Sequence, residues 1–143
     1  MRRPPPPPPP TLIAGSAAFA AQKVQTPDDL DKAMKKIGAA NGAMNKAIKA
    51  MAWADAKKQV AVVEETLQDA HNFWVVKKRD DAIKMSTEVL AKVGTVKAAL
   101  DKPAPDSANV MAAVKDFASS CLGCHKQYRE QDENQQFILK PGI

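Results

Sequence analysis

The chain has 143 residues, enough for one domain with a single hydrophobic core. Its formal net charge is +5, but no stripe of lysine and arginine interleaved with aromatic residues occurs, which argues against nucleic-acid binding. Aromatic residues make up only 5% of the chain, and alanine, lysine and valine are abundant, so helices are favoured over strands. No run of about eighteen apolar residues occurs, and we expect no transmembrane helix and no stable membrane insertion.

Residues 1–21 resemble a signal peptide. Arg2 and Arg3 give a positive start, residues 12–21 form a short apolar run, and Ala18-Phe19-Ala20 matches the small-x-small pattern that precedes a cleavage site. Seven consecutive prolines, residues 4–10, depart from the usual signal peptide and are typical of a polyproline II rod. We expect an exported, periplasmic protein whose folded domain spans residues 22–131.

A first helix is predicted from Pro27 onwards. Thr26 can cap it, proline suits the first helical position, and Asp28 and Asp29 favour the positive end of the helix dipole. A 4-3 spacing, typical of one buried helix face, then connects the following residues, of which only the asparagine is polar: Leu30, Met34, Ile37, Asn41, Met44, Ile48 and Met51.

The same spacing predicts a second helix, with Asp55 as the best available cap. Its apolar face contains Trp53, Ala56, Val60, Val63, Leu67, Ala70 and Trp74. His71 lies beside this face, and we interpret it as a partly exposed helix residue in preference to a metal ligand.

Two further helices follow a charged turn at residues 77–81. Asp80 or Asp81 opens the third, which ends at the proline-containing stretch 101–105, and Asp106 or Ser107 caps the fourth. The fourth helix buries Val110, Val114, Phe117, Cys121, Cys124 and Tyr128. Four helices of similar length with short connections predict an all-α, antiparallel four-helix bundle, followed by an extended tail at residues 132–143.

The fourth helix carries the most informative motif, Cys121-Leu122-Gly123-Cys124-His125. This spacing is the attachment signature of a c-type haem: both thiols can form thioether bonds to one porphyrin, and the histidine can bind its iron. A structural zinc site needs four ligands, and the only other histidine, His71, lies far upstream. A thioredoxin-like motif needs a βαβ setting, and a disulfide across two helical residues would be strained.

The haem motif on the last helix of a bundle resembles the class II c-type cytochromes, the cytochrome c′ and cytochrome c556 family. The resemblance covers Pro27–Glu130 and is sharpest at Cys121-x-x-Cys124-His125-x-x-Tyr128-Arg129. It implies one covalent haem c on Cys121 and Cys124, His125 as the proximal axial ligand, and Arg129 near the haem edge.

The resemblance also places Met34 at the distal position over the iron. A methionine there is typical of cytochrome c556, whereas cytochrome c′ has an apolar residue and a five-coordinate iron. Gly38 and Gly42 follow Met34 and would leave room for a flat porphyrin. Methionine is also a common core residue, so packing remains the alternative for Met34, and Met44 is the next candidate ligand.

We therefore expect a periplasmic electron-transfer haem protein with His/Met ligation, a redox protein as partner, and a possible homodimer. The alternative is a cytochrome c′-like protein that binds nitric oxide or carbon monoxide at an open or displaceable sixth position. We do not expect an enzyme, because no distal His/Arg pair for peroxide chemistry is recognisable in the sequence.

Overall fold

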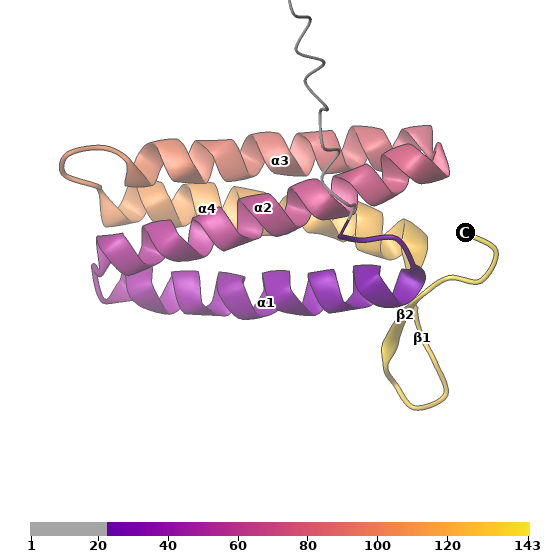
Figure 1. The fold of residues 1–143 in the computed structure, drawn as a ribbon. Helices are drawn as coiled ribbons and strands as arrows, with labels where there is room; N and C mark the ends of the chain where they lie inside the picture. The colour runs from indigo at the N-terminus through magenta and orange to yellow at the C-terminus, as the bar shows by residue number, and fades with distance from the viewer. Residues whose placement is uncertain (1–22) are drawn as a thin grey trace, which may run out of the picture.

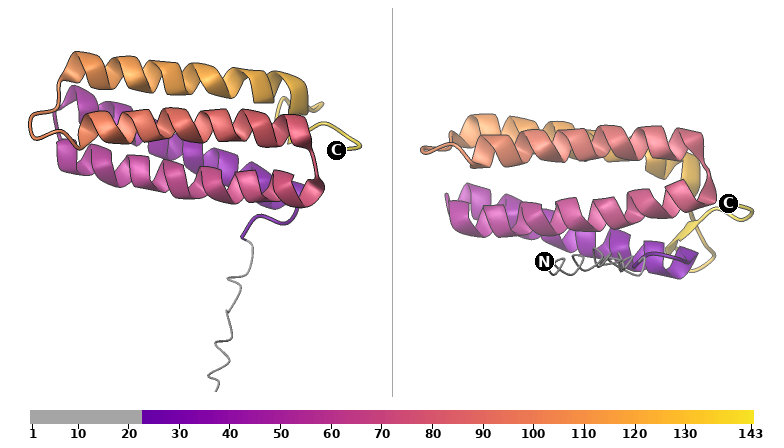
Figure 2. Two further views of the ribbon diagram at one scale, coloured as in Figure 1. Left: turned by 90° about the horizontal axis from the view of Figure 1, so that it is seen from above. Right: turned by 45° about the horizontal axis from the view of Figure 1, so that its top comes forward.

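A computed structural model describes residues 23–143, so the signal-peptide prediction for residues 1–21 lies outside the described part of the chain. The described residues form four helices, α1 (Pro27–Lys49), α2 (Trp53–Lys77), α3 (Asp80–Leu100) and α4 (Ser107–Tyr128). Consecutive helices run in opposite directions and lie side by side (Figures 1 and 2). The predicted four-helix architecture is confirmed, and the described residues also contain a small two-stranded sheet.

Local capping explains where two of the helices begin. The Thr26 hydroxyl accepts a hydrogen bond from the Asp29 amide at 3.1 Å, and the Asp29 carboxylate accepts one from the Thr26 amide at 3.1 Å, so α1 opens with a capping box. The Asp106 carboxylate caps α4 by accepting a hydrogen bond from the Ala108 amide at 2.8 Å. The expectation for α2 was wrong, because its N-cap is Ala52 and Asp55 lies within the first turn.

The predicted apolar faces form the core, with one exception at the end of α1. Met44, Val63 and Val110 are almost fully buried in the main cluster between the helices, and Val96 of α3 is buried with them. Met51, predicted to continue the α1 face, is instead 65% exposed. The reason is that α1 ends at Lys49, and Met51 has a left-handed backbone (φ 54°) in the turn to α2.

A second core cluster lies at the end of the bundle where α1 begins and α4 ends. Its buried members include Leu30, Phe73, Trp74, Ala82 and Tyr128. The Trp74 and Tyr128 rings have centroids 4.8 Å apart. The Tyr128 hydroxyl donates a hydrogen bond to the Asp81 carboxylate, which ties the end of α4 to the start of α3.

The C-terminal residues form a β-hairpin, so the expected extended tail is corrected. Strand β1 (Arg129–Gln131) pairs antiparallel with β2 (Phe137–Leu139), and the hairpin lies at the end of the bundle where α1 begins (Figure 1). In the connecting turn, the Asp132 carboxylate accepts hydrogen bonds from the Asn134 and Gln136 amides, each at 2.9 Å.

Within residues 23–143 no helix is long and apolar enough to cross a membrane.

Candidate functional site

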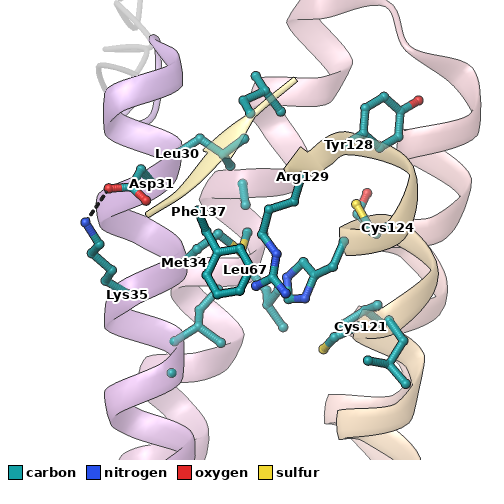
Figure 3. Close-up of a pocket in the computed structure, with 18 of the residues that line it drawn as sticks. Leu30, Asp31, Met34, Lys35, Leu67, Cys121, Cys124, Tyr128, Arg129 and Phe137 are labelled. Carbon is teal, nitrogen blue, oxygen red and sulfur yellow. Dashed lines mark hydrogen bonds and ion pairs between the residues drawn. The ribbon is translucent and has the colours of Figure 1, made fainter. Parts of the chain in front are cut away.

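A pocket of about 460 Å³ lies between α1 and α4, with further walls from α2 and the hairpin. Figure 3 shows Met34 on the α1 side and Cys121 and Cys124 on the α4 side. Pockets for small molecules and cofactors have volumes of roughly 300–1,000 Å³, and this one falls within that range. The residues that the sequence singled out for haem attachment and distal ligation therefore line one cavity from opposite sides.

The α4 wall contains the complete Cys-x-x-Cys-His motif. Cys121, Cys124 and His125 are each partly buried and line the pocket, and neither cysteine is in a disulfide. The two cysteines are three residues apart, so one helical turn places both thiols on the same face. The Cys121 thiol donates a weak hydrogen bond to the Phe117 carbonyl, with a sulfur–oxygen distance of 3.6 Å.

Burial on this wall favours the neutral forms of the thiols and the imidazole. Burial raises the pKa of the Cys121 thiol and, with contributions from Cys121 and Asp81, raises the pKa of the Cys124 thiol to about 11. Burial also lowers the pKa of His125, and the Arg129 guanidinium lowers it further. The imidazole is thus neutral at pH 7 and keeps a lone pair for a metal ion.

The α1 wall is mostly apolar. Leu30, Met34 and Ile37 line the pocket, and Gly38 follows Met34 by one turn. A Cβ atom added to Gly38 would have no neighbour within 4 Å, so this wall leaves open space beside the methionine. Gly42 does not line the pocket.

The structure separates the two candidate methionines. Met34 is partly buried and lines the pocket, whereas Met44 is 0% exposed in the main core and does not. Met34 therefore lies in the pocket wall and its role as a distal ligand stays a prediction, whereas Met44 packs in the core.

Asn41 is the one polar residue on the buried face of α1. It lines the pocket, and its Oδ1 atom is buried without a hydrogen-bond partner. A buried amide oxygen without a partner is costly by about 1–3 kcal/mol. On this wall, Asp31 and Lys35 form an ion pair at 2.7 Å, whereas the Asn41 oxygen is free to stabilise a polar group of a bound molecule.

The remaining predicted residues have clear positions. Arg129 lines the pocket, and its guanidinium carbon lies 3.8 Å from the centroid of the Phe137 ring. His71 lies outside the pocket lining, and its Nδ1 atom is 2.7 Å from the Ser86 hydroxyl. His71 has intermediate burial on α2, which agrees with its interpretation as a partly exposed helix residue.

Sequence reasoning missed the hairpin wall of the pocket. Residues 135–139 line it, although the sequence analysis treated them as part of a tail. The apolar run Phe137-Ile138-Leu139 was the available signal, because three such residues favour a strand and burial. On α2, Leu67, Ala70 and Trp74 line the pocket, and all three belong to the predicted core face; α3 contributes Ser86 and Val89.

The site has the donor set that a c-type haem requires. Two thiols and a neutral imidazole line one wall, a thioether lies on the other, and the lining between them is largely apolar. Within residues 23–143, no group of three or more histidine, cysteine, aspartate or glutamate side chains is placed so that it could hold a metal ion.

Comparisons of the chain with protein-family models, with curated proteins and with solved structures found no match.

Proposed function

We propose that this protein is an exported electron-transfer haem protein with one c-type haem in the pocket between α1 and α4. The observation that carries the proposal is the placement of Met34 opposite the Cys-x-x-Cys-His motif across a single cavity. A motif match in the sequence is a hypothesis, and a cofactor-sized pocket at the motif is the structural context that supports it.

Different residues of the chain would bind the porphyrin and the iron of the haem. Cys121 and Cys124 would hold the porphyrin covalently, His125 would bind the iron on the α4 side, and Met34 would bind it on the α1 side. The bound haem would supply one-electron oxidation and reduction. The apolar side chains of α1 and α2 would exclude water, and thioether ligation would favour a high reduction potential.

The cofactor assignment is tested by mass spectrometry after expression with a haem-attachment system. The full chain should gain the mass of one haem that survives denaturing extraction, and Cys121→Ala combined with Cys124→Ala should lose it. Met85→Leu is a matched control, because Met85 lies beside the motif, with its sulfur 3.7 Å from the position of a Cβ on Gly123, but outside the pocket lining. If the double cysteine variant keeps its haem after denaturing extraction, the assignment of Cys121 and Cys124 as attachment sites is wrong.

The electron-transfer role is tested by optical spectra of the oxidised and reduced protein, followed by carbon monoxide. A low-spin spectrum that does not respond to carbon monoxide is expected from two protein ligands. A high-spin spectrum that shifts with carbon monoxide would contradict it.

A gas-binding function is the second candidate, and the open space at Gly38 favours it. An uncharged diatomic molecule would find an apolar wall there, beside a methionine side chain with several rotatable bonds. The expected signature of gas binding is the displacement of Met34 from the iron by nitric oxide or carbon monoxide in the reduced protein. Binding constants for these gases, measured with the wild type and with Met34→Leu, separate the two functions.

A further inference from the structure

The C-terminal hairpin is attached to the bundle at several points. The Lys140 amide donates a hydrogen bond to the Tyr128 carbonyl at 2.8 Å, and the Arg79 guanidinium donates one to the Gly142 carbonyl at 3.2 Å. Leu139 and Ile143 pack against the second core cluster. The hairpin is therefore a built part of the pocket and has a defined position relative to α1 and α4.

The strand register places Arg129 and Phe137 on one face of the hairpin. Arg129 is paired with Leu139, and Phe137 lies two residues before Leu139, so the three side chains share a face. Because Leu139 packs inwards, this face is directed towards the bundle. Figure 3 shows the Arg129 and Phe137 side chains beside each other between α1 and α4.

Phe137 keeps a large apolar ring at the outer part of the pocket. The ring lines the pocket and is still 49% exposed. The Arg129 guanidinium, 3.8 Å from the ring centroid, holds it by a cation–π contact, a geometry that the planar guanidinium suits well. The contact with Arg129 therefore fixes an apolar ring at the partly exposed edge of the pocket.

We propose that Phe137, held by Arg129, limits the access of water and of exogenous ligands to the haem pocket. This inference rests on the proposed function. It makes Phe137 a specificity-determining residue: a diatomic molecule passes the ring, whereas a molecule of the size of imidazole is slowed by it. Exclusion of water from the mouth also raises the reduction potential, because the oxidised haem carries more charge and depends more on hydration.

The test compares Phe137→Ala with its parent in the Met34→Leu background, in which the thioether of Met34 no longer competes for the iron. Association rates of imidazole and of carbon monoxide are measured on the haem-loaded full chain. We expect the imidazole rate to rise about tenfold in Phe137→Ala, as for a barrier lowered by roughly 1.4 kcal/mol, and the carbon monoxide rate to change much less. In the wild-type background, Phe137→Ala should lower the reduction potential.

Two controls distinguish an effect on ligand access to the pocket from a general loss of side-chain packing. Val76→Ala removes a side chain that is 64% exposed and outside the pocket lining, and it should leave both rates unchanged. Phe137→Leu keeps much of the bulk, and it should restore most of the slow imidazole binding. Equal imidazole rates in Phe137→Ala and its parent would overturn the proposal, as would an equal effect of Val76→Ala.

A haem-free measurement distinguishes failure of this proposal from failure of the proposed function. In the haem-free chain, Cys121 and Cys124 report access to the pocket, because both line it and both are free thiols. Phe137→Ala should accelerate labelling by a bulky fluorescein maleimide more than labelling by iodoacetamide. If the chain never acquires haem but this size-dependent effect is found, the access role stands and the haem assignment fails; if haem is attached and no size dependence appears in either assay, only the access role fails.

Discussion

Met34 and Met44 lie on the same helix and offer a comparison between a pocket residue and a core residue. Met44 is 0% exposed, so Met44→Ala removes a fully buried side chain and leaves a cavity. We expect the free energy of unfolding of the Met44→Ala variant to be lower than that of the wild type by about 2–5 kcal/mol. Met34 is partly buried and borders an existing pocket, so Met34→Ala creates no new closed cavity, and a fall of about 1–2 kcal/mol is expected.

Leucine replacements of the same two methionines test binding to the iron instead of stability. Replacement of methionine by leucine nearly conserves volume and is usually destabilising by less than about 1.5 kcal/mol, so both variants should fold. In the haem-loaded protein, Met34→Leu should convert a low-spin spectrum to a high-spin one that responds to carbon monoxide, while Met44→Leu should leave the spectrum unchanged. Urea unfolding of the haem-free alanine variants, followed by circular dichroism, supplies the stability values.

Two results would refute this reasoning. If Met34→Ala destabilises the haem-free chain as much as Met44→Ala, Met34 is a core residue and the described pocket does not border it. If Met34→Leu leaves the spectrum of the loaded protein unchanged, Met34 is not an iron ligand.

Three other residues give independent predictions. His125→Ala should retain covalent haem but lose the proximal ligand, which mass spectrometry and optical spectra of the same sample would show together. Asn41→Leu should leave the stability of the haem-free chain unchanged or raise it by about 1 kcal/mol, because it removes a buried oxygen without a partner; a clear loss in urea unfolding would contradict this. Backbone hydrogen bonds from Gln25 and Thr26 hold the pKa of Asp29 below its ordinary value of 3.8. The stabilisation from Asp29 is therefore complete above about pH 4 and is lost as the pH falls through the folded-state pKa, so Asp29→Asn should make thermal stability less sensitive to acid in that range.

Local signals in the sequence were sufficient to predict the four helices. The 4-3 spacing of apolar residues identifies buried faces, and Thr26 and Asp106 cap helices through contacts with residues only two or three positions away. Such features need no knowledge of distant parts of the chain. The same holds for the Cys-x-x-Cys-His motif, because its chemistry depends on spacing within one helical turn.

Predictions that depended on where a helix ends, or on distant partners, were less successful. The apolar pattern extended to Met51, although the backbone had already left the helix at Lys49. The last residues lack helical periodicity and contain a proline and a glycine, so their local pattern favoured a tail. Their hairpin depends on the antiparallel pairing of β1 with β2 and on packing against the second core cluster.

The sequence by itself determined the number of helices, their buried faces and the placement of the two thiols and the imidazole on one helix, because all of these follow from the periodicity of a single helix. Only the tertiary structure decided that Met34 borders a pocket and Met44 does not, since both have the same spacing along α1. It also decided that Phe137 and Arg129 meet at the mouth of that pocket. The physical reason is that a pocket is a property of the space between elements, and its walls come from segments far apart in the chain.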